Sequence, residues 1–283
     1  MNVADAMTPR SEVVTVEIPG TRNDVLAYLQ ERQFSSVPVV KREDGTENYR
    51  GLVSREDLIE NPGEDQLALL MQEVPTTTRE ATIEDAARLM VEEGARRVPV
   101  VDGQLEGIVT VTDVIRAIAE DEAAGDTEVG ELAADEVNAT WEGTPLPVAE
   151  RELSFAGVPY AVVLDDEGAM NGMLTEVDVI DVAQVVEGEA ETGDSIANED
   201  DEWMWEGIKA VGNSYMPTRD VEIPAEPVRE FMTEELVTVS RSRTARECAQ
   251  LMITHDIEQI PLVSGGRLAG IVTDMHLLEG TYE

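Results

Sequence analysis

Hydrophobic and polar residues follow one another in this chain as short blocks that recur about every sixty residues. In each block, apolar residues spaced three and four positions apart precede two short runs rich in Val, Ile and Leu. The first pattern predicts a helix with one buried face, and the second predicts a pair of strands. The clearest helix starts at Thr82-Ile-Glu-Asp85, a capping box followed by apolar residues. We therefore expect each block to fold as strand, helix, strand, strand and helix.

A phrase with a central proline marks the first of the two paired strands in each block. The four copies are Val37-Pro38-Val39-Val40, Val98-Pro99-Val100-Val101, Val158-Pro159-Tyr160-Ala161 and Ile260-Pro261-Leu262-Val263. Successive prolines lie 61, 60 and 102 residues apart, and a 39-residue interruption at 187–225 explains most of the last interval. The chain therefore contains four internal repeats.

The second paired strand of each repeat begins near a glycine and ends at a serine or threonine. Three residues after that hydroxyl comes an aspartate in three repeats and a histidine in the fourth, at the predicted start of the last helix. Asp44-Gly45 and Asp102-Gly103 predict turns between paired strands. The four segments are Gly51–Asp57, Gly107–Asp113, Gly172–Asp178 and Gly270–His276.

The third repeat departs from this pattern at its first helix. Pro145 and Pro147 fall where that helix should begin, so we expect it to be shortened or displaced. One repeat buries too little core to fold alone, so the repeats should work in pairs that form modules at 1–125 and 126–283. The predicted organisation is an α+β fold with repeats at 1–62, 63–125, 126–186 and 226–283 and an acidic, tryptophan-containing insertion at 187–225.

Composition excludes several classes of protein. The 283 residues include 60 Asp and Glu against 20 Lys and Arg, a formal net charge of −40. This charge argues against binding to nucleic acid or to a membrane surface, and no apolar run is long enough to span a bilayer. The first ten residues lack a signal sequence, so we expect a mature cytoplasmic protein. The excess of carboxylates is similar to that of proteins from organisms with molar internal salt, which screens such charge.

The repeats resemble the cystathionine-β-synthase (CBS) domain family, chiefly through Val98-Pro99-Val100-Val101 and Gly107-Ile-Val-Thr-Val-Thr-Asp113. In that family two repeats pair about a pseudo-twofold axis, and the clefts between them bind AMP, ADP, ATP or S-adenosylmethionine. The resemblance implies four β-α-β-β-α repeats in two such pairs, an adenosine nucleotide as ligand, and neither catalysis nor a cofactor. It also implies that an unidentified client protein is regulated in trans. The pairs would meet either in a homodimer or face to face within one chain.

The resemblance also implies which side chains meet the nucleotide. Carboxylates would hold the ribose, hydroxyls the ribose or phosphate, arginines the phosphate, and valines of the opposing repeat the base. The start of a helix favours phosphate binding because its free N–H groups attract an anion. Thr-x-x-Asp at a helix start is also a cap that needs no ligand, so the ligand site and the cap both stay open as interpretations. The residues are Asp57, Asp113 and Asp178; Ser54, Thr110, Thr112, Thr175 and Thr273; Arg96 and Arg97; and Val14, Val37 and Val39.

The fourth repeat is the weakest candidate for a ligand site. His276 stands where the other repeats have aspartate, and a neutral imidazole cannot accept bonds from both ribose hydroxyls. Gln259 stands where the second repeat has Arg97, which removes a cation for phosphate. The arginines of the second repeat could equally be solvated or paired with the many carboxylates. We expect the main site in the first module, at Asp113.

Two further features admit more than one interpretation. Residues 187–202 hold eight acids and precede Trp203-Met204-Trp205, which either completes the core of the second module or forms a contact surface. Cys248 and His255 could form a nucleophile and a base, although a buried thiol is the simpler expectation. No familiar enzyme motif is present. The main rival to a nucleotide sensor is therefore a structural interaction protein with empty clefts.

Overall fold

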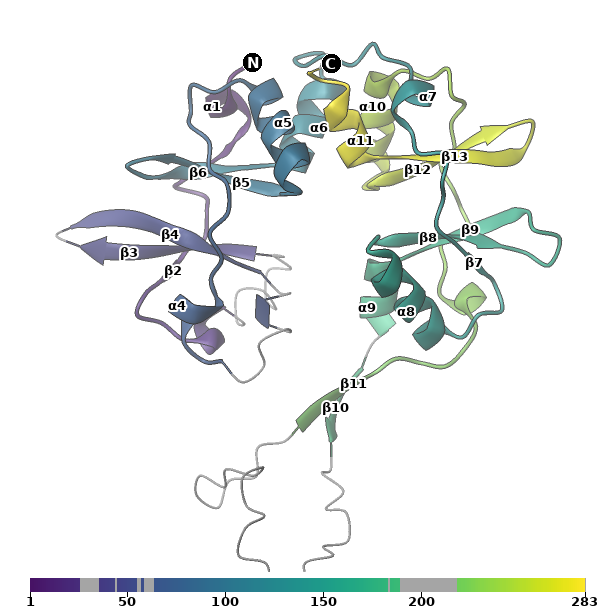
Figure 1. The fold of residues 1–283 in the computed structure, drawn as a ribbon, viewed down its shortest axis with the longest axis horizontal. Helices are drawn as coiled ribbons and strands as arrows, with labels where there is room; N and C mark the ends of the chain where they lie inside the picture. Colours follow the sequence, from purple (N-terminus) through teal and green to yellow (C-terminus); the bar gives the residue numbers. More distant parts are fainter. Residues whose placement is uncertain are drawn as a thin grey trace, which may run out of the picture. The chain divides into compact units, whose positions relative to one another are not determined.

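The structure is a computed structural model that describes residues 1–25, 36–43, 45–54, 57–58, 64–182, 184–188 and 218–282. The chain forms two compact units (Figure 1). One unit, Met1–Glu136 with Val237–Glu283, holds the first, second and fourth repeats, and the other, Val137–Leu236, holds the third. The boundary between the units therefore differs from the boundary predicted between the two modules.

The second repeat shows the architecture most completely. The capping box of Thr82 and Asp85 starts its first helix as predicted, and Gly94 ends that helix in the left-handed conformation. Gly103, with a φ of 69°, closes the hairpin between its two strands. Its elements are α5 (Ile83–Glu93), β5 (Arg97–Asp102), β6 (Gln104–Thr110) and α6 (Val111–Ala119).

The other repeats contain the same antiparallel pair of strands, and the fold class is α+β as predicted. Strands β2 and β7 add a parallel first strand in the first and third repeats. Single parallel bridges, Thr77 with Val100 and Val239 with Leu262, take that place in the second and fourth. The elements are β2 (Val16–Glu17), β3 (Ser36–Glu43) and β4 (Thr46–Ser54) in the first repeat; β7 (Ala139–Trp141), α8 (Leu146–Ala156), β8 (Tyr160–Leu164), β9 (Met170–Thr175) and α9 (Glu176–Val182) in the third; and α10 (Ala245–His255), β12 (Gln259–Ser264), β13 (Arg267–Thr273) and α11 (Asp274–Glu279) in the fourth.

Short segments are exchanged between repeats that are neighbours in the chain. Each segment precedes one repeat and bonds to the last strand of the other: Thr8 to Ile108, Gln72 to Leu52, Ala134 to Ile271, and Thr233 to Met173. The exchange is reciprocal between the first and second repeats and between the third and fourth. Each of these repeats is therefore completed by a segment that precedes its neighbour in the chain. The segments contain α1 (Val3–Ala6) with β1 (Thr8–Pro9), α4 (Leu67–Leu70), α7 (Val129–Leu132) and η1 (Val228–Glu230).

The helices of the second and fourth repeats share one hydrophobic core. Buried residues of α5, α6, α10 and α11, among them Met90, Ile118, Met252 and Leu278, belong to a single cluster. Figure 1 shows these four helices together at the top of the view. Separate, smaller cores lie in the first and third repeats. Within this unit the helices of the second and fourth repeats therefore pack against each other, whereas the choice between a homodimer and a meeting of the two predicted pairs within one chain stays a prediction.

The third repeat carries its first paired strand three residues later than the proline phrase predicts. Pro99 lies seventeen residues after the N-cap of α5, and Val162, rather than Pro159, lies seventeen residues after the N-cap of α8. The pairing of β5 with β6 and that of β8 with β9 give the same alignment of Val162 with Pro99. The Val162 N–H donates to the Asn138 carbonyl at 2.9 Å, a bond that proline could not make.

This shift also corrects the prediction for the first helix of the third repeat. Helix α8 has 11 residues, as α5 and α10 do, so it is neither shortened nor displaced. Pro145 is its N-cap and Pro147 lies in its first turn, where backbone N–H groups have no partner within the helix. The expected degeneration is wrong because proline disrupts a helix only beyond its first turn.

Two strands bracket the insertion between the third and fourth repeats. β10 (Gln184–Gly188) and β11 (Thr218–Glu222) form an antiparallel ribbon that Figure 1 shows after α9. The predicted linker is thus anchored by paired strands at both ends. Trp203 and Trp205 lie outside the described residues, so their role in the core or in a contact surface stays a prediction.

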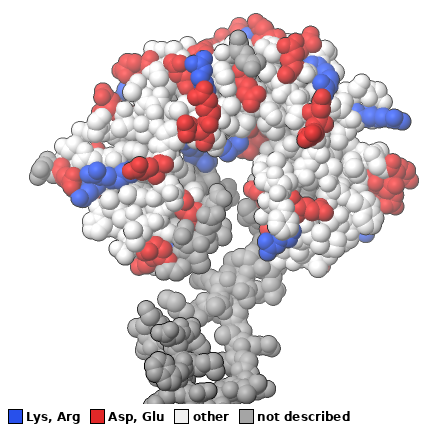
Figure 2. Space-filling model, viewed as in Figure 1, with Lys and Arg blue, Asp and Glu red and all other residues white. Residues whose placement is uncertain are grey.

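The surface carries the charge that the composition predicts. Figure 2 shows Asp and Glu spread over the visible face of the described parts, with Lys and Arg interspersed among them. Among the described helices, none combines the length and the apolar character that a membrane crossing requires.

Candidate functional site

In each repeat a helix begins where the second paired strand ends, and we call this place the strand–helix junction. At the junction of the second repeat, Thr110 Oγ1 and N donate to Asp113 Oδ2 at 2.8 and 2.9 Å. The Asp113 N–H points back to Thr110 Oγ1 at 3.4 Å. These bonds form a capping box at the start of α6, while Thr112 is exposed in the first turn and takes no part in it. The cap interpretation is therefore confirmed, and the cap also orients the carboxylate.

The other three junctions have the same geometry. In each, the backbone N–H of the hydroxyl residue donates to the side chain three positions later, which is a carboxylate in two repeats and an imidazole in the fourth. The predicted meeting of hydroxyl and carboxylate is therefore confirmed in the first, second and third repeats, whereas a ligand role stays a prediction. The N–H bonds are Ser54 to Asp57 Oδ2 at 2.7 Å, Thr175 to Asp178 Oδ2 at 2.8 Å and Thr273 to His276 Nδ1 at 3.1 Å.

The second carboxylate oxygen of Asp113 faces a cation. Asp113 Oδ1 lies 3.2 Å from Arg116 Nη1, one helical turn further along α6. Asp113 is buried, but the Arg116 side chain is 49% exposed. An ion pair with so much solvent contact is worth about 0–1 kcal/mol, so a ligand hydroxyl could replace the guanidinium at small cost.

The strand residue opposite the cap differs from junction to junction. Residues directly opposite on antiparallel strands have side chains on the same face, so this residue borders the junction. Arg97 therefore brings a positive charge to the junction of the second repeat. Ser36 and Tyr160 were missed as site residues, although Ser36 precedes the proline phrase as Arg97 does. The opposed pairs are Ser36 with Ser54, Arg97 with Thr110, Tyr160 with Thr175 and Gln259 with Thr273.

Arg96 has a different role from the one predicted. Its Nη2 lies 2.5 Å from Asp274 Oδ2 and 3.0 Å from Glu258 Oε1, both in the fourth repeat. Burial alone would lower the pKa of Arg96, but the hydrogen bond and charge of Asp274, with those of Glu258, outweigh it and raise the pKa. The ion pair with Asp274 directs the Arg96 guanidinium to the fourth repeat, whereas Arg97, opposite Thr110, borders the junction. The assignment of Arg96 to phosphate is therefore corrected: it joins the second and fourth repeats.

The three valines predicted to contact the base differ in environment. Val37 and Val39 are 1% and 0% exposed in the core of the first repeat, so they present no surface to a ligand. The alternation along β3 places Pro38 and Val40 on the opposite face. Of the three, Val14 alone is partly exposed. The assignment of Val37 and Val39 to the base is therefore corrected.

The junction of the fourth repeat keeps its hydroxyl but not its carboxylate. Because His276 Nδ1 accepts the Thr273 N–H, this nitrogen carries no proton. Burial lowers the pKa of His276, and the nearby carboxylates of Glu279 and Asp274 oppose that effect. With His276 in the cap and Gln259 opposite it, this junction lacks the carboxylate and the arginine that the second repeat has at the same two positions.

Other chemistry is weakly represented in the described part of the chain. Cys248 is fully buried, and burial, with the nearby charge of Glu247, raises its pKa to about 12, which makes the thiol a poor nucleophile. Within the described ranges no three His, Cys, Asp or Glu side chains gather as a metal site. An open pocket in the third-repeat unit lies at the end of α9 remote from its junction, and is lined by Asp181, Val182, Pro224, Glu226, Pro227, Glu230 and Phe231.

Comparison with known proteins agrees with this architecture. The family model for the CBS domain matches residues 3–64, 68–120 and 228–282. A structure from Pyrococcus horikoshii covers 99% of both chains with 28% identity and a TM-score of 0.70. Protein MJ1404 of Methanocaldococcus jannaschii is 26% identical over 279 residues, which are 98% of this chain but only 61% of that protein. The CBS domain-containing protein CBSX2 of Arabidopsis thaliana is 31% identical over 151 residues, covering 41% of this chain and 62% of that protein.

Proposed function

Because the chain belongs to the CBS domain family, we propose that it is a regulatory protein that binds an adenosine nucleotide between its first and second repeats. The observation that supports this most directly is the junction of the second repeat, which combines Arg97, Thr110 and Asp113. None of the other three junctions has a cation opposite its cap and a carboxylate within it.

The groups at this junction suit the parts of a nucleotide. The N-terminal N–H groups of α6 and its dipole favour an anion, and Arg97 adds a formal positive charge for phosphate. Asp113 uses Oδ2 in the cap, and Oδ1 can accept hydrogen bonds from a ribose hydroxyl once Arg116 moves aside. The cap holds the carboxylate in place before the ligand arrives, which lowers the ordering cost of binding.

The proposed output is a change in the relative stability of two arrangements of the repeats. A ligand shifts such an equilibrium only if it binds one arrangement more tightly, and typical coupling free energies are about 1–3 kcal/mol. Arg96, the residue next to Arg97, pairs with Asp274 in the first turn of α11. A ligand at the junction of the second repeat could therefore affect the fourth repeat through this ion pair. The regulated partner protein, a homodimer and a cytoplasmic location remain parts of the proposal.

Calorimetric titration of the full chain in molar KCl with AMP, ADP, ATP and S-adenosylmethionine tests this proposal. AMP is the first compound to try, because CBSX2 has been crystallised in complex with AMP. We expect saturable binding of at least one compound. Asp113→Asn should weaken it roughly tenfold to a hundredfold, because a charge-assisted hydrogen bond contributes about 1.5–3 kcal/mol.

Asp85→Asn is the matched control. Asp85 forms the same capping box with Thr82 at the start of α5, in the same repeat but away from the junction. Both variants should lose similar stability, and only Asp113→Asn should lose affinity. Equal affinity in both variants would show that Asp113 is a cap and nothing more.

One observation favours a second candidate function, a structural interaction module without a ligand. Both oxygens of Asp113 already have partners in Thr110 and Arg116, so the junction is satisfied without a nucleotide. If none of the four compounds binds, the protein belongs to this second class. Its partner should then be sought by cross-linking in molar salt.

A further inference from the structure

The pocket at the end of α9 lies at the base of the insertion. It has a volume of about 570 Å³, and Val182 and Pro224 border it two residues before β10 and two residues after β11. Its other apolar walls are Pro227 and Phe231. Val182 and Phe231 also pack against the hydrophobic core of the third repeat, so the pocket lies at the edge of that core. A pocket of this size and lining can hold a large apolar side chain.

Three carboxylates border the same pocket, and they have few partners. They belong to Asp181, Glu226 and Glu230. Glu230 pairs with Arg229 at 3.7 Å. Within the part of the chain that the structure describes, the side chains of Asp181 and Glu226 form neither a hydrogen bond nor an ion pair. The rim of the pocket can therefore accept hydrogen bonds or a cation.

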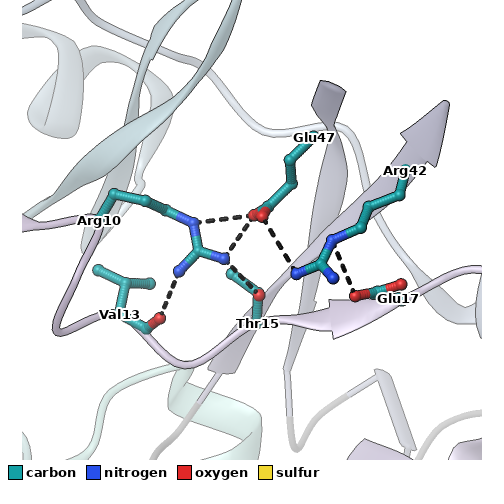
Figure 3. A network of polar contacts seen from close by, with 6 residues as sticks. All are labelled: Arg10, Val13, Thr15, Glu17, Arg42 and Glu47. Atoms are coloured by element: carbon teal, nitrogen blue, oxygen red, sulfur yellow. Dashed lines mark hydrogen bonds and ion pairs between the residues drawn. The ribbon is translucent and has the colours of Figure 1, made fainter. Parts of the chain in front are cut away.

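A carboxylate in the first repeat shows the partners that such a group has elsewhere in this chain (Figure 3). Arg10 Nε and Nη2 donate to Glu47 Oε1 at 2.8 and 2.5 Å, and Arg42 Nη2 lies 3.7 Å from Glu47 Oε2. The Arg10 guanidinium also donates to the Val13 carbonyl and to Thr15 Oγ1. Glu47 is thus satisfied by two arginines, whereas none of the described residues that line the pocket is basic.

Residues 203–211 of the insertion contain the groups that this pocket could accommodate. Their sequence, Trp-Met-Trp-Glu-Gly-Ile-Lys-Ala-Val, is largely apolar, and Lys209 is the one basic residue between β10 and β11. Trp205 and Lys209 are four positions apart, the spacing at which side chains meet on one face of a helix. An indole combines a large apolar surface with one N–H donor, so it suits an apolar wall edged by carboxylates.

The insertion is long enough to bring this segment to the pocket. The ribbon pairs Gln184 with Glu222 at its base and Gly188 with Thr218 at its tip, so it rises about 13 Å. Trp205 lies 13 residues before Thr218, and a chain of that length can span roughly 43–47 Å. The segment can therefore return along the ribbon to its base.

We propose that the segment 203–211 docks into this pocket of its own chain. The indole of Trp205 packs against Phe231, and the Lys209 ammonium pairs with the carboxylates of Asp181 and Glu226. Of the two interpretations that the sequence leaves open for the tryptophans, this proposal selects the one in which they complete a core, and it assigns that core to the third repeat. The proposal is independent of the nucleotide function.

The test measures how accessible the Trp205 indole is in the full chain. Trp141→Phe and Trp203→Phe together leave Trp205 as the only tryptophan. We expect acrylamide to quench its fluorescence about threefold more weakly than that of free N-acetyltryptophanamide, because pockets of this kind bury about 70–90% of the surface of their occupant.

Two further variants should remove this protection. Phe231→Ala takes away the wall of the pocket and should raise quenching towards the value for the free indole. Lys209→Glu leaves every pocket residue in place and should also raise it, because the new carboxylate faces Asp181 and Glu226. The measurement is made at the lowest KCl concentration that keeps the protein folded by circular dichroism, since salt screens the ion pair. If Phe231→Ala does not fold, Lys209→Glu decides.

Phe155→Ala is the matched control, because Phe155 is an apolar side chain of the same unit that is 86% exposed. It lies in the last turn of α8, beside the connection whose Pro159 carbonyl accepts the Glu176 N–H at 3.0 Å, and so at the other end of α9 from the pocket. This variant should leave the quenching of Trp205 unchanged.

Three results would overturn the proposal. The first is a Trp205 that is quenched as freely as the free indole in folded protein. The second is protection that is lost in Phe155→Ala and kept in Phe231→Ala and Lys209→Glu, which would place the segment on α8 instead. The third is protection that disappears on dilution, which would show that the segment fills the pocket of a second copy of the chain.

Discussion

At the scale of single residues, the chemistry of each junction depends on which atom accepts the hydrogen bond of the cap. A carboxylate keeps a second oxygen for other partners, as Asp113 does for Arg116. His276 has one acceptor nitrogen, and the Thr273 N–H occupies it. The same three-residue spacing therefore produces a possible ribose site in one repeat and a closed, neutral cap in another.

The imidazole cap should make stability depend on pH near neutrality. Burial lowers the pKa of His276 from its ordinary value of 6.5, although Asp274 and Glu279 oppose the effect. The cap therefore contributes fully above pH 6.5, and its contribution falls as the pH drops through 6.5 towards the lowered pKa, because the unfolded chain takes up the proton first. Denaturant unfolding between pH 8 and 5 should show this loss.

His276→Asn keeps an acceptor without a titrating group and should flatten that pH dependence. The exposed His255 supplies the control, since His255→Gln should leave the wild-type curve unchanged. The capping carboxylate of α5 loses its contribution outside this pH window, because hydrogen bonds from Thr82 lower the pKa of Asp85 and fail only in more acidic solution. An unchanged slope in His276→Asn would contradict the assigned protonation.

At the scale of elements, the glycines that precede the junctions of the first, second and fourth repeats share one steric reason, the close approach of a backbone carbonyl. A Cβ at Gly107 would lie 2.4 Å from the carbonyl oxygen of Thr8, the residue that bonds to the adjacent Ile108. A Cβ at Gly51 would meet the Gln72 carbonyl at 2.6 Å in the same way. Glycine therefore allows the exchanged segment to approach the strand, and its regular occurrence in the sequence marks that contact.

Gly107→Ala should destabilise the fold by about 1–3 kcal/mol, the usual cost of forcing extra volume into a packed site. The backbone atoms that it would strike cannot rotate away, so the exchanged strand β1 must shift. Gly94→Ala is the control, because nothing lies within 4 Å of that Cβ and only the left-handed conformation opposes it, at about 1 kcal/mol. Urea unfolding measures both. A smaller loss at Gly107 than at Gly94 would contradict the close approach.

How much of these elements could be foreseen depends on the range of the interactions involved. The hairpins and the capping box of α5 were predicted correctly, because residues within four positions of one another determine them. Strand β8 was placed three residues too early because Pro159 resembles Pro99 locally. The true register is set by contacts with distant residues, namely the pairing of β8 with β7 and β9 and the bond from Val162 to Asn138 just before β7.

At the scale of the whole molecule, a net charge of −40 has to be reconciled with an anionic ligand. At about 1 M salt the Debye length is roughly 3 Å, so distant carboxylates barely repel a phosphate, while the N–H groups and Arg97 at the junction act in contact. The proposed site is therefore a local one within an acidic surface (Figure 2).

Nucleotide affinity should consequently hold or rise as KCl increases from about 0.1 to 2 M. Binding guided by long-range attraction would weaken over the same range, because salt screens it. Titration calorimetry at four salt concentrations makes the measurement, and the melting temperature of the ligand-free protein at each concentration separates folding from binding. A steady fall in affinity with salt, in protein that stays folded, would contradict the proposal.

The sequence by itself determined the number of repeats, the α+β class and the capping box of α5, because short-range periodicity and hydrogen bonds between near neighbours specify them. Only the tertiary structure decided which repeat each short segment completes, that Arg96 binds Asp274 in the fourth repeat, and that Val37 and Val39 face a core. These features depend on strand register and on contacts between residues far apart in the chain, such as Arg96 and Asp274 at a separation of 178 positions, so local patterns do not reveal them. The charge alone argued against polyanionic partners such as nucleic acid, whereas the geometry at Arg97 and Asp113 supports the proposal of a small anionic ligand.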